Sequence, residues 1–184
     1  MIITVTGKPC SGKGTVSKLF CEKFGFKYIG TGDIFREYAK KFGFNTITDF
    51  QTDERIKIID KLVDDKIYEL GQKSLNENIV IDSRPAWHFI PNSFKVFIDI
   101  DDNIAGERLL KANRPTEKVQ TLNEAIKVLK KRWNDENERY MEQYKVNNLN
   151  LNQYDFVISS NSLSPEEIVD LIYKNYENFI KNLK

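Results

Sequence analysis

Five short runs of apolar residues recur along the chain, and patterns typical of amphipathic helices lie between them. The runs cover residues 2–5, 79–81, 96–100 and 156–158, with a weaker one at 28–29. Near-continuous apolar runs of this length are typical of strands buried on both faces of a sheet. Strands that alternate with helices form βαβ units with right-handed crossovers. The pattern therefore predicts an α/β fold with a central, mostly parallel five-stranded sheet flanked by helices.

The helices are expected where apolar residues repeat at helical spacing. Residues 13–24 place apolar side chains on one face, and Gly25 follows as a typical helix stop. Residues 121–124 and 164–167 match the capping box, in which two side chains satisfy backbone N–H groups at a helix start. The remaining helices are expected at residues 33–42, 53–70, 103–111, 122–144 and from 165 to the C-terminus.

Composition narrows the class of protein. The 184 residues suit a single domain, 1–184, and carry 28 basic against 27 acidic side chains. This balance gives no overall attraction to nucleic acid or to a membrane, and no apolar run approaches the roughly 20 residues that span a bilayer. A strand-like start without a leader pattern predicts a cytoplasmic protein, and we expect a monomer.

A glycine-rich loop carries the first chemical signal. Residues 7–15 read GKPCSGKGT and follow the first predicted strand directly. They match the phosphate-loop pattern G-x-x-x-x-G-K-[ST] through Lys13, but Gly14 takes the hydroxyl position and the hydroxyl comes one residue later, at Thr15. Backbone N–H groups here would face phosphate oxygens, and Lys13 would reach the β and γ phosphates. The predicted ATP site comprises Gly7, Lys8, Pro9, Cys10, Ser11, Gly12, Lys13, Gly14 and Thr15.

Two further loops are expected beside this one. IGTGDIFRE at 29–37 follows the second strand, and IVIDSRPAW at 79–87 ends a buried strand in Asp82, Ser83 and Arg84. Taken alone, Thr31 is a plausible helix cap and Arg36 a surface charge. Ligands of open α/β sheets bind beyond the carboxyl ends of the strands, so we expect all three loops to open onto one edge.

The combination of GKPCSGKGT, TGDIFR, IDSR and RWNDENERY resembles the nucleoside monophosphate kinases, and most of all their short archaeal-type cytidylate kinase branch. The resemblance extends from Ile2 to about residue 172. Cytidylate kinase is favoured over adenylate kinase by the short chain, the compact region around RWNDENERYMEQY, and IDSR in place of D-G-x-P-R. The resemblance implies a P-loop NTPase fold that transfers a phosphoryl group from ATP to CMP or dCMP with Mg²⁺.

The resemblance also implies roles for individual residues. Lys13 would serve the donor phosphates, and Arg36 and Arg84 the acceptor phosphate. Thr31 and Gly32 would line the sugar and base pocket of the acceptor. Asp82, also counted in the acceptor site, would hold Mg²⁺ through water, with the Thr15 hydroxyl as a second candidate. Phosphoryl transfer needs positive charge and positioning around the moving group, which these residue types supply.

The remaining charge is expected from a lid at about 108–145, opposite an NMP-binding segment at about 31–75. Arg132 and Arg139 lie seven residues apart on one predicted helix face, and solvated ion pairs with Asp135 or Glu136 are the less favoured alternative. Arg108 resembles the family arginine that contacts ATP. Whether Lys111 or Arg114 provides the next cation is left open.

Other functions remain possible on the sequence alone. An adenylate kinase, or a small-molecule kinase of the same fold, would use the same loops with a different acceptor. A non-catalytic nucleotide-binding module would have little use for the second set of arginines. For His88, packing or base-pocket lining is favoured over a chemical role, and for Trp87 and Trp133 packing in the core or lid is favoured over stacking on nucleic acid. No motif in residues 42–70 identifies the side chains that read the base.

Overall fold

The computed structural model describes residues 1–44, 55–73, 77–112 and 119–183 of the chain. Its core is a five-stranded sheet with the order β2-β3-β1-β4-β5, in which every neighbouring pair is parallel. The α/β class and the parallel sheet predicted from the sequence are confirmed. The strands are β1 (Ile2–Gly7), β2 (Lys27–Gly30), β3 (Ile79–Asp82), β4 (Phe94–Asp99) and β5 (Phe156–Ser159).

The register of the sheet sets where the loops meet. Gly30 at the end of β2 and Val5 of β1 both lie opposite Asp82, the last residue of β3. Gly7, which ends β1, lies opposite Ile98 of β4. The three loops expected from the sequence therefore leave the sheet side by side, at one edge.

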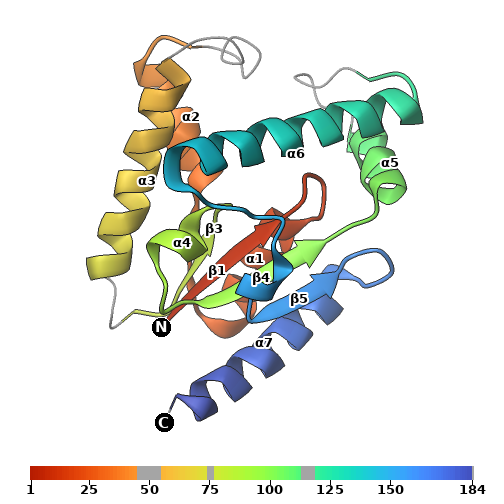
Figure 1. The fold of residues 1–184 in the computed structure, drawn as a ribbon. Helices are drawn as coiled ribbons and strands as arrows, with labels where there is room; N and C mark the ends of the chain where they lie inside the picture. Colours follow the sequence, from red (N-terminus) through yellow and green to blue (C-terminus); the bar gives the residue numbers. More distant parts are fainter. Residues whose placement is uncertain (45–54, 74–76, 113–118, 184) are drawn as a thin grey trace.

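Helices cover both faces of the sheet (Figure 1). One face carries α1 (Lys13–Phe24) and α7 (Pro165–Asn182), whose apolar side chains pack with Ile3, Val5 and Ile98 of the sheet. The other face carries α2 (Thr31–Lys41), α3 (Arg55–Lys73) and the short α4 (Ala86–Phe89). None of the helices in the described parts of the chain has the length and apolar character needed to cross a membrane.

Two more helices lie at the edge where the loops leave the sheet. α5 (Asp102–Ala112) packs along the first half of α6 (Leu122–Tyr144), and α6 then crosses from α5 to α3 (Figure 1). A single 3-10 turn, Leu151–Gln153, precedes β5. α6 thus bridges two sides of the molecule over the site.

Most helix boundaries agree with the sequence prediction. α1 and α6 begin and end at the expected residues, and both capping boxes form, at Thr121 and at Ser164. α2 begins two residues early, at Thr31, because the Thr31 hydroxyl donates to the backbone oxygen of Asp82 rather than capping a helix. α4 was not expected, since four residues are too few for a periodic pattern.

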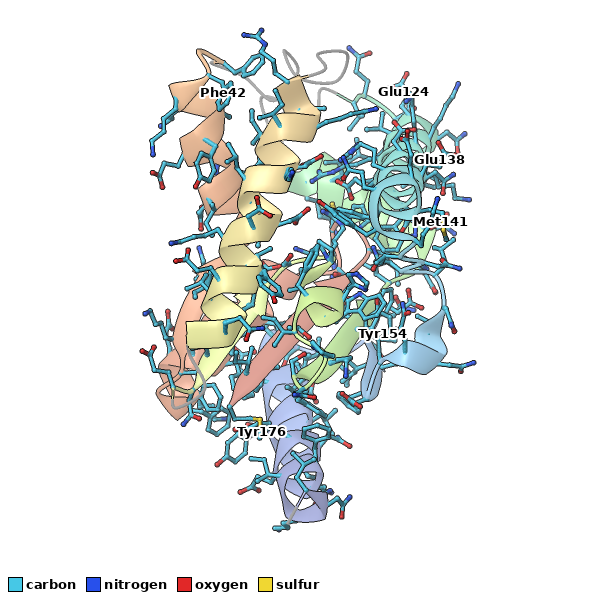
Figure 2. The ribbon with its side chains drawn as sticks, turned by 60° about the vertical axis from the view of Figure 1, so that its left-hand side comes forward. Phe42, Glu124, Glu138, Met141, Tyr154 and Tyr176 are labelled. Carbon is cyan, nitrogen blue, oxygen red and sulfur yellow. The ribbon has the colours of Figure 1, made fainter. Side chains whose placement is uncertain are left out.

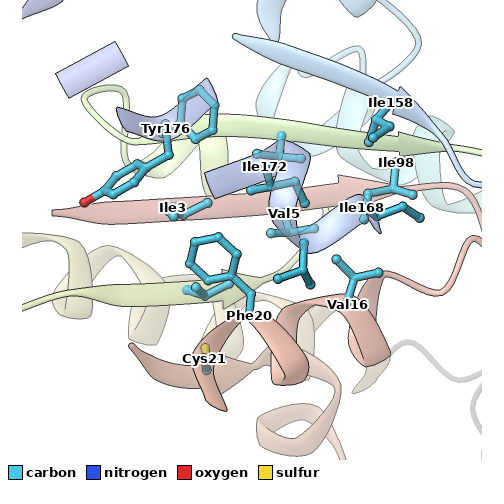
Figure 3. Close-up of a cluster of buried hydrophobic side chains, with 14 residues drawn as sticks. Ile3, Val5, Val16, Phe20, Cys21, Ile98, Ile158, Ile168, Ile172 and Tyr176 are labelled. Carbon is cyan, nitrogen blue, oxygen red and sulfur yellow. The ribbon is translucent and has the colours of Figure 1, made fainter. Parts of the chain in front are cut away.

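Side chains on the buried face of α7 allow the packing of the core to be tested (Figure 3). Ile172 is 1% exposed and packs in the cluster between α1, α7 and the sheet, whereas its neighbour Leu171 is 37% exposed. We expect Ile172→Ala to lower the free energy of unfolding by about 2–5 kcal/mol, because it removes buried methyl groups and leaves a cavity. Leu171→Ala is the control and should cost less than about 1 kcal/mol in denaturant unfolding. Equal losses for the two variants would contradict this packing.

Candidate active site

The phosphate loop forms a tight turn between β1 and α1. Gly12 caps α1 with a φ of +83°, and Cys10 also adopts a left-handed φ of +62°. A Cβ on Gly7 would lie 2.5 Å from the backbone oxygen of Ile98, so only glycine fits there. None of the described side chains caps α1, and its first turn contains no acidic residue. Its N-terminal N–H groups can therefore bind an anion.

Lys13 forms an ion pair with the carboxylate at the end of β3. Its Nζ lies 2.5 Å from Oδ1 of Asp82, and the Tyr28 hydroxyl donates to Oδ2 at 3.3 Å. Burial lowers the pKa of Lys13, and the charge of Asp82 opposes that shift. Burial also raises the pKa of Tyr28, followed by the charge of Asp82, so the phenol remains a proton donor. Asp82 therefore supports a positive Lys13 beside the loop.

The oxygen atoms near the loop fit a magnesium ion that is held mainly by the nucleotide. Asp82 lies against the loop, since a Cβ on Gly14 would come within 3.2 Å of its Oδ2. Thr15, at the start of α1, is exposed. No group of three or more His, Cys, Asp or Glu side chains able to bind a metal occurs among the described residues. Mg²⁺ prefers a few protein oxygens together with water and phosphate, which this arrangement can provide.

A second charged cluster connects the loop after β3 with α6. Glu136 of α6 lies 2.8 Å from Nε of Arg84 and 3.2 Å from Nε of Arg132. The side chains of Arg84 and Glu136 are only 14% and 11% exposed, and the Arg84 guanidinium lies 6.0 Å from the ring centre of Trp133. Arg132 and Glu136 do form the i, i+4 pair considered for this helix, but it is a partly buried pair shared with Arg84 rather than a solvated one.

Further contacts join α6 to α3. Arg139 Nε lies 3.4 Å from Oδ2 of Asp60, and the Tyr144 hydroxyl donates to Oδ2 of Asp64 at 2.7 Å. In Figure 2, Glu138 and Met141 lie on the opposite side of α6, away from α3. Burial raises the pKa of Asp60, and it raises the pKa of Asp64 to about 7, although the hydrogen bond from Tyr144 acts in the other direction.

Arg108 of α5 connects the phosphate loop with the segment after β5. Its Nη1 donates to the backbone oxygen of Cys10 and to Oγ of Ser160, both at 3.2 Å, and its Nη2 donates to the backbone oxygen of Ser160 at 2.7 Å. On the same side, Lys8 lies 2.8 Å from Asp99. The arginine predicted to contact ATP thus lies directly beside the loop.

Other predicted residues lie further from these clusters. Arg36 is 57% exposed and forms an ion pair with Asp33 one turn earlier on α2. A Cβ on Gly32 would lie 3.5 Å from its guanidinium, so Gly32 leaves room for Arg36. Lys111 is exposed at the end of α5, and Arg114 lies outside the described residues.

The sequence did not identify two buried carboxylates of α3, one that pairs with Arg139 and one that accepts a hydrogen bond from Tyr144. Asp60 and Asp64 were missed, although they follow Ile59 and Val63 directly and so border the apolar stripe of α3. Acidic residues four apart at the edge of a buried helix face are a usable signal, because such residues are rarely buried without a partner. Glu136 was considered only as a partner for α6 arginines, and nothing in its spacing indicates the contact with Arg84.

Comparison with known proteins identifies the family to which this chain belongs. The profile of a family described as "AAA domain" matches residues 3–144. The cytidylate kinase of Archaeoglobus fulgidus is 33% identical over the whole of this chain and 98% of that protein. The chain belongs to the archaeal-type cytidylate kinase family. The family's cytidylate kinase from Methanosphaera stadtmanae is 28% identical, over 97% of this chain and 99% of its own. The P-loop kinase assignment made from the sequence motifs is therefore confirmed.

Two other relatives show the range of proteins that contain this kinase fold. Shikimate kinase from Bacteroides thetaiotaomicron superposes with a TM-score of 0.66 over 98% of both chains, at 17% identity, which supports the fold alone. A protein named S-adenosylmethionine-dependent nucleotide dehydratase, from Lacinutrix mariniflava, is 35% identical over 95% of this chain. The chain spans only 36% of that relative's length.

The buried Asp64 makes the stability of the kinase depend on pH. Because its pKa is about 7 in the folded protein and near 3.8 when exposed, its favourable contribution is complete below about pH 4 and is lost as the pH rises to 7. The free energy of unfolding of Asp64→Asn, minus that of the wild type, should therefore increase by about 2 kcal/mol between pH 5 and pH 8. Urea unfolding of both proteins at the two pH values measures this difference.

Asp65→Asn is the matched control, because Asp65 is exposed on the same helix and its loss changes the net charge equally. A pH-independent difference between Asp64→Asn and the wild type would contradict the raised pKa of Asp64.

Proposed function

We propose that the protein transfers the γ-phosphate of ATP to CMP or dCMP in the presence of Mg²⁺. The observation that carries this proposal is a second set of cations beside the phosphate loop. Arg84 and Arg132 meet at Glu136, next to the Lys13–Asp82 pair, and Arg139 follows on the same helix. A protein that only bound ATP would need the loop alone. Two adjacent phosphate sites suit a reaction between two phosphorylated substrates.

The donor side of the reaction is built on the loop. Lys13 and the N-terminus of α1 bind the β and γ phosphates, and Arg108 supports the loop from the side of α5. Mg²⁺, held by the nucleotide and by water on Asp82, would supply positive charge at the transferred phosphoryl group, with Thr15 as a second oxygen donor. These groups stabilise charge that spreads over the phosphoryl oxygens in the transition state.

The acceptor side uses the arginines that are paired with Glu136 and Asp60. The phosphate of the acceptor replaces Glu136 at Arg84 and Arg132, and Arg139 and Arg36 complete the site. Thr31 and Gly32, at the start of α2, lie beside the acceptor sugar. We assign residues 31–75 to acceptor binding and 108–145 to a lid, whose closure would exclude water and so limit hydrolysis of ATP.

Two alternatives make different predictions. A kinase for AMP or for a small molecule, as in the structural neighbours, would turn over that acceptor faster than CMP. A nucleotide-binding module without activity would show no turnover. The cations at 84, 132 and 139 argue against the module, because three arginines gathered on two carboxylates that are each only 11% exposed are costly to keep without a second anion to bind.

A coupled assay with ATP, Mg²⁺ and a panel of acceptors tests the proposal. We expect CMP and dCMP to be phosphorylated faster than UMP, AMP, GMP or shikimate. Lys13→Met should lower kcat by about 100-fold or more, because it removes the cation at the transferred phosphate, while circular dichroism remains unchanged. Wild-type protein that phosphorylates none of the acceptors would refute the kinase.

The acceptor role of Arg84 makes a second prediction. Arg84→Ala should raise KM for CMP by about 10- to 100-fold and change KM for ATP much less, because Arg84 binds the acceptor phosphate. The control is Lys131→Ala, which removes an exposed cation of α6 that pairs with Asp135. Initial rates with one substrate varied at a time separate the two constants. An equal increase in the KM for CMP and the KM for ATP would contradict the assignment of Arg84 to the acceptor site.

A further inference from the structure

A cavity of about 420 Å³ lies where α3, α4 and α6 meet. Asp64 lines it from α3, Phe89 from α4, and Gln143 and Tyr144 from the end of α6. None of the residues assigned above to phosphate binding lines this cavity. Its size and mixed lining suit a small, flat ligand group that carries a few polar atoms.

The cavity lies next to the acceptor phosphate site on each of the three elements that form it. Asp64 follows Asp60 by four residues on α3, and Gln143 follows Arg139 by four on α6, which is about 6 Å along each helix axis. Phe89 follows Arg84 by five residues, through α4. A nucleotide whose phosphate is bound by Arg84 and Arg139 can therefore extend its base into the cavity.

The walls of the cavity provide an aromatic surface and hydrogen-bond acceptors, together with two exposed cations, Lys57 and Lys61. The rings of Phe89 and Tyr144 meet edge to face with centroids 5.1 Å apart. Asp64 is only 6% exposed, and Tyr144 donates to one of its oxygens. Oε1 of Gln143 is buried without a hydrogen-bond partner among the described residues. A buried acceptor without a donor is unfavourable, so this wall favours a ligand that donates hydrogen bonds.

We propose that Asp64, with Gln143 and Tyr144, determines acceptor specificity by binding the amino edge of cytosine. This inference rests on the proposed function, because it places the base of the acceptor nucleotide in the cavity. The exocyclic amino group of cytosine donates to the Asp64 carboxyl and to the Gln143 oxygen. Uracil has a carbonyl oxygen at the same position, so two acceptors would face each other and binding would be weaker.

The raised pKa of Asp64, about 7, allows both of its protonation states at neutral pH. The ionised carboxylate only accepts hydrogen bonds and so favours the cytosine amino group, whereas the protonated form can also donate, either to the ring nitrogen of cytosine or to the carbonyl oxygen of uracil. The groups that surround it are Tyr144 from α6, Asp60 and Asp65 from α3, and Phe89 from α4. The neighbouring carboxylates raise the pKa of Asp64 further, which favours the protonated form.

The test compares CMP with UMP as acceptors for the wild type, Asp64→Asn and Asp170→Asn. For Asp64→Asn we expect kcat/KM with CMP to fall by about 10- to 100-fold and the preference for CMP over UMP to shrink, because an amide can donate to the uracil oxygen. The KM for ATP should stay within about twofold. Asp170, on α7, is 58% exposed and does not line the cavity, so Asp170→Asn should keep the wild-type preference. An unchanged ratio of CMP to UMP in Asp64→Asn would overturn the assignment.

Calorimetric binding of CMP and UMP separates this inference from the proposed function. A wild type that prefers CMP in binding, loses that preference in Asp64→Asn and shows no turnover would refute the kinase but support the base site. Equal binding of CMP and UMP by the wild type would refute the base site alone. If Asp64→Asn does not fold, Gln143→Leu replaces it, with the same loss of CMP preference expected.

Discussion

Repulsion between cations is the constraint on which the site depends. Phosphoryl transfer needs several positive groups within a few ångströms of each other. These groups repel one another unless an anion lies between them, and the folded protein must hold them together despite this repulsion. The structure pairs each with a carboxylate: Lys13 with Asp82, Arg84 and Arg132 with Glu136, and Arg139 with Asp60. All of these pairs except Arg132–Glu136, which lies within α6, join two different segments of the chain. Breaking a partly buried pair of this kind is costly, because it leaves the remaining charge without a partner. The carboxylates thus maintain the cations in position between substrates.

The sheet makes these pairings possible. Because β1 and β2 lie beside β3 in parallel register, the residues that end all three strands emerge at one edge. The loop after β1 holds Lys13, and β3 ends at Asp82, so the first ion pair follows from strand order alone. The other three pairs require α6, which crosses this edge and reaches α3 (Figure 1). The sheet therefore positions the proposed donor site, while helix contacts position the proposed acceptor site.

The features that could be predicted from the sequence are those encoded by residues that lie close together in the chain. The phosphate loop, the strands and the capped starts of α6 and α7 are each encoded within a few residues, and the structure agrees with them. The pairings of Glu136 with Arg84 and of Asp64 with Tyr144 join residues 52 and 80 positions apart. No local pattern encodes such contacts, so the arginines could be found from the family motif, but of their carboxylate partners only Glu136 for Arg132, four residues away on the same helix, could be. The start of α2 was placed late for the same reason, since the Thr31 hydroxyl contacts β3 rather than its own helix.

The shared position of Glu136 between two arginines has a consequence for turnover on the proposed function. An acceptor phosphate that enters the site exchanges one anion for another, so the free energy of binding is the difference between two ion-pair arrangements rather than the full attraction of phosphate to arginine. The same exchange runs in reverse when the product leaves, with Glu136 recapturing the arginines as the phosphate departs. The site can then combine a strong local field with moderate affinity, which allows rapid release of a highly charged product.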